Sequence, residues 1–171
     1  TGLKELGNVF LEEFPKAQYQ ACWVHLGRAM CRHVRNKDWK EVLGEAKKIY
    51  GSTSKEEAEK QLSSFIEKYE GKYPKAVNVI RDNPSLFSFY DYPAEIQRSL
   101  YTSNPIESFN KKYKKNIRKK EQFPTEDSLD RFTCAIASDY NKQFESRQMK
   151  GFSKCSYELQ QLFEERYGSK G

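Results

Sequence analysis

Apolar side chains recur every three or four residues along most of this chain, the spacing that puts them on one face of an α-helix. Leu3, Leu6, Phe10 and Phe14 begin the series, and Pro15 predicts the end of that first helix. The same spacing predicts helices over 25–34 and 39–50, between Ser54 and Gly71, from Pro74 to about residue 80, and over 104–117, 125–144 and 157–167.

One stretch, Gln18–Val24, departs from the helical spacing and predicts a short strand. A single strand leaves backbone groups unpaired at both edges. Either this stretch is not a strand, or its partner strands lie outside this chain. The fold class expected of these 171 residues is therefore mostly α.

The composition narrows the class of protein. Aromatic residues make up 14% of the chain, enough to build a core, and no apolar run approaches the roughly 20 residues of a membrane span. A membrane protein, a collagen and a fully disordered chain are thereby excluded. The four cysteines are widely and irregularly spaced, so we expect reduced thiols rather than a disulfide framework.

Positive charge is concentrated in one place. The chain carries 30 Lys and Arg against 24 Asp and Glu, a formal net charge of +6. Seven of the ten residues from 111 to 120 are cationic: Lys111, Lys112, Lys114, Lys115, Arg118, Lys119 and Lys120. On a helix most of them share one face, which suits phosphate contacts. A solvated helix face is the alternative, although the run contains no acidic residue.

Glu107 lies one turn before this run. Asn104 as N-cap, Pro105 at the first helical position and Glu107 at the third would cap the helix. A carboxylate on the first turn of a basic helix could instead hold a divalent metal beside a DNA phosphate. Local rules alone favour the cap.

Cys22 and His25, followed by Cys31 and His33, suggest a zinc site. Cys31 and His33 are only two residues apart and point to different sides of a helix, so a packing role is preferred. The role of Cys22-x-x-His25 is left open. The chain has neither a nucleophile–histidine pattern nor a glycine-rich phosphate loop.

These segments, taken in order, resemble the Mutator-type DDE transposases of bacterial insertion sequences. The resemblance rests on Cys22-x-x-His25, Lys72-Tyr73-Pro74, Pro93-x-Glu95-Ile96, the segment 101–110 (Tyr-Thr-Ser-Asn-Pro-Ile-Glu-Ser-Phe-Asn), the basic helix and Phe123-Pro124. It covers nearly the whole chain and is most specific around Glu107.

The resemblance implies part of an RNase H-like α/β catalytic domain interrupted by an all-α insertion. Residues 1–38 would belong to the RNase H-like core, 39–100 to the insertion, and 101–171 to the C-terminal part of the core. Glu107 would be the last acidic residue of a catalytic triad.

The resemblance also implies a chemistry. Glu107 would bind Mg²⁺ (or Mn²⁺) together with two aspartates expected outside this chain, and two metals would carry the phosphoryl transfer that cuts and joins transposon ends. This chain would then be a fragment, inactive and without bound metal on its own. Its partners would be double-stranded DNA and further copies of the full-length protein, in the bacterial cytoplasm at the nucleoid.

Two other classes of function fit the same residues. One is a noncatalytic helical DNA-binding or regulatory protein, in which Glu107 only caps a helix. The other is a helical interaction module whose basic run binds acidic proteins. Salt-dependent binding to duplex DNA separates a nucleic-acid partner from a protein partner.

Overall fold

A computed structural model describes residues 9–10, 12–102, 104–120, 122–147, 149 and 151–168, with the backbone alone at 104–106. Its elements are α2 (Trp23–Cys31), η1 (Asn36–Asp38), α3 (Trp39–Tyr50), α4 (Lys55–Tyr69), α5 (Pro74–Val77), η2 (Ser88–Asp91), α6 (Ala94–Leu100), α7 (Asn104–Ile117), α8 (Glu126–Phe144) and α9 (Ser156–Tyr167). The mostly α class is confirmed. Leu3 and Leu6 lie outside the described residues, whereas residues 9–10 and 12–13 are helical as predicted.

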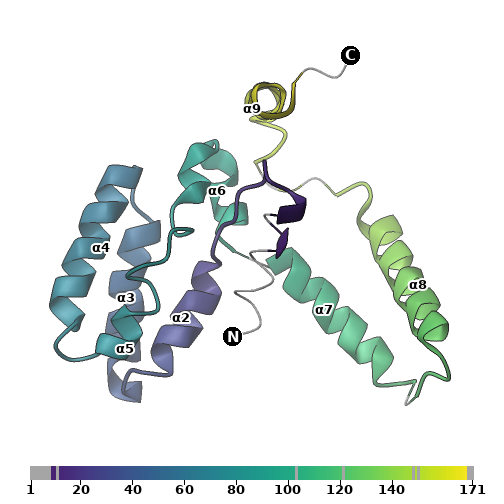
Figure 1. The fold of residues 1–171 in the computed structure, drawn as a ribbon, viewed down its shortest axis with the longest axis horizontal. Helices are drawn as coiled ribbons and strands as arrows, with labels where there is room; N and C mark the ends of the chain where they lie inside the picture. The colour runs from purple at the N-terminus through teal and green to yellow at the C-terminus, as the bar shows by residue number, and fades with distance from the viewer. Residues whose placement is uncertain are drawn as a thin grey trace.

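The helices form two groups. In Figure 1, α2, α3, α4 and α5 pack together on one side, and α7 runs beside α8 on the other. Helix α6 joins the two groups, and α9 lies at the end of the chain. Arg166 of α9 donates hydrogen bonds to Tyr92 Oη at 2.9 Å and to Gln18 Oε1 at 3.1 Å, which connects this last helix to the residue after η2 and to the segment before α2.

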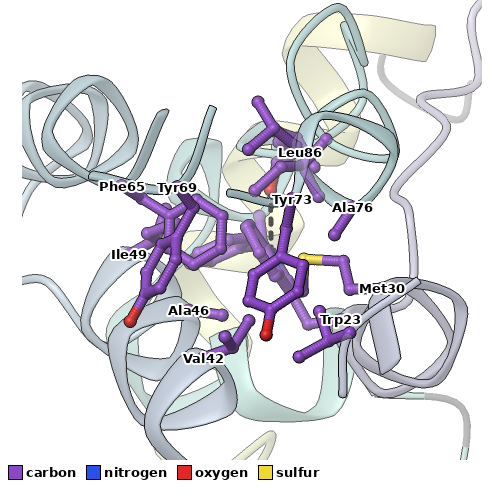
Figure 2. Close-up of a cluster of buried hydrophobic side chains, with 14 residues drawn as sticks. Trp23, Met30, Val42, Ala46, Ile49, Phe65, Tyr69, Tyr73, Ala76 and Leu86 are labelled. Atoms are coloured by element: carbon purple, nitrogen blue, oxygen red, sulfur yellow. Dashed lines mark hydrogen bonds between the residues drawn. The ribbon is translucent and has the colours of Figure 1, made fainter. Parts of the chain in front are cut away.

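The core lies within the first group. It is built mainly from aromatic and branched side chains of α2 to α5, together with the loop that follows α5 (Figure 2). Met30, Ile49, Val77 and Ile80 are fully buried. Gly27 lets α2 approach α3 closely, because a Cβ there would lie 3.1 Å from Leu43 Cδ2.

Two predicted helix starts are confirmed by their caps. Ser54 Oγ accepts a hydrogen bond from the backbone N–H of Glu57 at 3.2 Å, and Glu57 in turn accepts from Thr53 N–H at 2.8 Å. At the start of α8, Thr125 Oγ1 accepts from Ser128 N–H at 3.2 Å, and Ser128 Oγ accepts from Thr125 N–H at 3.3 Å. Each cap satisfies donors that a helix N-terminus otherwise leaves unpaired.

The strand prediction for Gln18–Val24 is wrong. Trp23 and Val24 already belong to α2, and the described part of the chain contains no strand. The extended residues before α2 bond to the 85–89 loop instead: Ala21 N–H donates to Ser85 O at 2.8 Å, and the Gln20 side chain accepts from Phe89 N–H at 2.9 Å. These bonds satisfy the backbone without a neighbouring strand.

The segment 84–100 joins the two groups and is rich in aromatic residues, and it contains short helices that the periodicity did not predict. Helix η2 and helix α6 both lie in it, and α5 is a single turn rather than a helix to residue 80. Phe89 of η2 and Ile96 of α6 are each only 1% exposed. These short turns are stabilised by burial rather than by a long amphipathic repeat.

Candidate functional site

Helix α7 is divided into an aromatic face and a cationic face. Phe109 packs edge-on against Tyr140 of α8 with ring centroids 5.2 Å apart, and Tyr113 Oη lies 3.0 Å from Thr133 Oγ1. Four cations, Lys111, Lys114, Lys115 and Arg118, are exposed on the other side of the helix. Packing of the aromatic residues on α8 therefore fixes the direction in which the cations point.

Lys112, which helical spacing places beside the cationic face, lies on the α8 side. Its Nζ lies 3.2 Å from Gln143 Oε1 and 3.5 Å from Asp139 Oδ2, and it sits 5.6 Å from the centroid of the Tyr140 ring. Lys119 and Lys120 follow the helix in an exposed turn. The structure thus brings four of the seven predicted cations into one row.

That row forms one wall of an open groove of about 670 Å³. The groove is lined by His25 and Arg28 of α2, by Glu107, Asn110, Lys111, Lys114 and Lys115 of α7, and by Arg118 directly after α7. Glu107 is the one carboxylate among these lining residues. A surface of this composition attracts anions such as phosphate.

Glu107 is held from the opposite wall. Its Oε1 lies 3.3 Å from Arg28 Nη1 and 3.4 Å from His25 Nε2. His25 and Arg28 are three residues apart, so they share one face of α2. The Glu107 side chain remains 37% exposed, and its carboxylate is therefore accessible from the groove.

Glu107 also lies in the first turn of α7, where a negative charge is favoured by the helix dipole. The helix spans Asn104–Ile117, the range predicted from the sequence. The cap predicted from the side chains of Asn104 and Pro105 lies outside the described side chains. The helix start therefore positions Glu107, and α2 orients its carboxylate.

Sequence reasoning missed Arg28. His25 was singled out only through its spacing from Cys22, and nothing local predicted that either residue would meet Glu107. The signal that could have found Arg28 is its i+3 spacing from His25 on a helix.

The four candidate zinc ligands do not converge in the described part of the chain. No group of three or more His, Cys, Asp or Glu residues suited to a metal occurs there. Cys31 is partly buried, and burial raises the pKa of its thiol, which disfavours the thiolate that zinc binds. Packing roles for Cys22 and His25 remain a prediction.

Comparison with known proteins gives a family match described as "Transposase, Mutator family" over residues 1–147. The chain is 34% identical over 163 residues to the transposase for insertion sequence element IS905 of Lactococcus lactis subsp. lactis (strain IL1403), an alignment covering 95% of this chain and 42% of that protein. It is 35% identical over 140 residues to the transposase for IS1201 of Lactobacillus helveticus, covering 81% and 38%. It is also 30% identical over 145 residues to the transposase for ISRM3 of Rhizobium meliloti (strain 1021), covering 84% and 36%. The chain therefore spans about two fifths of the length of these relatives.

Proposed function

The chain belongs to the Mutator family of transposases, and we propose that it supplies Glu107 and a DNA-binding groove to the catalytic domain that cuts and joins transposon-end DNA. The observation that carries this proposal is the placement of Glu107 in a groove otherwise lined by cationic and polar side chains. A carboxylate at this position would lie close to a DNA phosphate bound in the groove.

Each lining residue has a physical role in this proposal. The four cations of α7 hold backbone phosphates and fix the register of the DNA, a contribution that does not depend on base sequence. Arg28 and His25 are positioning residues for Glu107, because both lie within 3.4 Å of its Oε1. Helix α8 acts indirectly, by fixing the orientation of α7.

Magnesium fits the donor chemistry of Glu107 but not a site made by this chain alone. Carboxylate oxygens are the ligands that Mg²⁺ prefers, and the half-exposed Glu107 faces the groove. The described residues offer no cluster of three acidic ligands, so the two further carboxylates are expected elsewhere in the full-length protein. When bound, a pair of metal ions supplies an activated nucleophile and stabilises the leaving oxygen.

A rival function, noncatalytic DNA binding, assigns Glu107 only to the start of α7. The two functions differ in what Glu107→Gln does to the full-length protein. Gln keeps the shape of the side chain and serves near a helix start almost as well, so stability should change by at most about 1 kcal/mol. If Glu107 is a metal ligand, loss of its charge should reduce Mg²⁺-dependent cleavage of transposon-end DNA by more than about a hundredfold, or roughly 2.7 kcal/mol of barrier.

The matched control is Glu126→Gln, which removes a first-turn glutamate from α8 instead. Both variants are compared with the parent by thermal melting and by cleavage of labelled end DNA. If Glu107→Gln cleaves end DNA at the parental rate, Glu107 only stabilises the start of α7 and the catalytic assignment is ruled out.

A further inference from the structure

We propose that the groove between α2 and α7 takes the backbone of one unpaired DNA strand, and that Arg28 contacts a phosphate of that strand while it orients Glu107. This inference rests on the proposed DNA-binding function. It adds α2 as a second wall of the DNA site and commits that site to a single strand.

The size of the groove favours one strand over a duplex. Its volume of about 670 Å³ falls within the range of pockets that enclose a small organic ligand. The major groove of a B-form duplex alone is about 12 Å wide, so a whole duplex does not enter such a space. A short stretch of sugar and phosphate is of the right scale.

The cations are spaced to follow a strand. Lys111 of α7 and Arg118, the residue directly after α7, are seven residues apart, which corresponds to about 10 Å along the helix axis. Successive phosphates of a strand that keeps its bases stacked advance by about 3.4 Å, so this row can accompany up to about three of them. Glu107 lies one turn before Lys111, and a strand that follows the row therefore leads to the carboxylate.

Arg28 can bind the Glu107 carboxylate and a DNA phosphate at the same time. Its Nη1 lies 3.3 Å from Glu107 Oε1, and its side chain is 61% exposed on the groove side of α2. A guanidinium carries five N–H donors in a planar fork, enough for a carboxylate and a phosphate together. Arg28 would thus place a phosphate directly beside Glu107.

The test is DNA binding by the 171-residue chain in the presence of a chelator, measured by fluorescence anisotropy at several salt concentrations. The probes are a blunt duplex and the same duplex with a single-stranded tail. Arg28→Gln should weaken binding of the tailed probe about tenfold, the size of one charge-assisted contact, and leave the blunt probe within about twofold of the parent.

A scan of the tail locates the contact. Single phosphates are replaced in turn by neutral methylphosphonates, and each replacement is measured with the parent, Arg28→Gln and Arg28→Lys. One replacement should weaken binding to the parent yet have no effect with Arg28→Gln, because the pair is already lost. Arg28→Lys should fall between them, since it keeps the charge and loses the fork.

Arg131→Gln removes an exposed arginine from α8, outside the groove lining, and should bind both probes like the parent. Equal weakening of both probes by Arg28→Gln, or additive effects at every tail phosphate, would overturn the single-strand inference while leaving a DNA surface in place. If Gln at Lys111, Lys114 and Lys115 changes binding to neither probe, the proposed DNA surface fails as well.

Discussion

Glu107 and Arg28 are 79 positions apart in the chain, yet their side chains meet at 3.3 Å. Composition and helical spacing predicted the cations of α7 and drew attention to Glu107. They could not predict Arg28, because its role depends on where the fold places α2 across the groove from Glu107 and not on its neighbours in sequence. Lys112 lies in a basic stretch of sequence, yet its side chain points to α8 because it contacts Gln143 and Asp139 there.

At the residue scale, Asp38 should make stability depend on acid pH. Its carboxylate accepts a hydrogen bond from Tyr73 and lies 3.0 Å from Lys72 Nζ, and these two partners hold its pKa below the ordinary value. A depressed native pKa adds stability that is present above the unfolded pKa of about 4 and is lost as pH falls through the native value.

Asp38→Asn should therefore lower the melting temperature more at pH 6 than at pH 2.5, because acid weakens the same interaction in the parent. The control is Asp130→Asn, which changes an exposed aspartate of α8. Melting curves of the three proteins across this pH range check the prediction. A pH profile of Asp38→Asn parallel to that of the parent would contradict it.

Replacing each of two glycines by alanine should change the stability of the protein in opposite directions. Gly151 has φ +96°, and a Cβ there would lie 2.2 Å from Glu95 O, so Gly151→Ala should cost at least about 1–3 kcal/mol. Gly44, on the exposed side of α3, has nothing within 4 Å of its Cβ position, and alanine should stabilise that helix by about 0.5–1 kcal/mol.

Denaturant unfolding of both variants measures these changes. Gly151 begins the turn 151–154, which precedes α9 and approaches Glu95 of α6. Because alanine at position 151 should displace this turn, amide hydrogen exchange in α9 should be faster in Gly151→Ala. A neutral Gly151→Ala would mean that this turn does not depend on the close approach to Glu95.

At the scale of elements, long helices were predictable and short ones were not. Helices α3, α4, α7, α8 and α9 each carry several turns of apolar spacing, and all appear where the spacing places them. The single turn α5 and the 3-10 turn η2 have too few residues for a repeat. The extended segment before α2 has β-type composition but bonds to a loop, so its tertiary partners decide its structure.

The start of α4 allows a test of capping within one helix. Ser54→Ala removes the acceptor for Glu57 N–H and should destabilise the protein by about 1 kcal/mol. Ser63→Ala changes a serine of the same helix whose Oγ bonds back to Glu59 O, and it should be neutral or slightly stabilising. Chemical denaturation of the two variants compares them, and equal costs would argue against the cap.

At the scale of the whole molecule, the core and the groove both join segments that are distant in sequence. Trp23 and Met30 of α2 share one buried cluster with α3, α4 and α5 (Figure 2). The predicted boundary near residue 38 thus crosses a continuous core, and the division into an RNase H-like part and an insertion stays a prediction. None of the described helices has both the length and the apolar character needed to span a membrane.

In the proposed function, the cationic face of α7 is the DNA surface. Changing Lys111, Lys114, Lys115 and Arg118 to Gln removes four groove cations. A matched variant changes Lys40, Lys47, Lys55 and Lys60, four exposed lysines of α3 and α4, and alters the net charge equally.

The most direct measurement is the slope of log affinity for the duplex with a single-stranded tail against log salt concentration, for the parent and these two variants. The α7 variant should flatten the slope by about 3, near 0.7 for each lost contact with a single strand, while the matched variant should keep the parental slope. An unchanged slope for the α7 variant, or equal flattening in both, would contradict the claim.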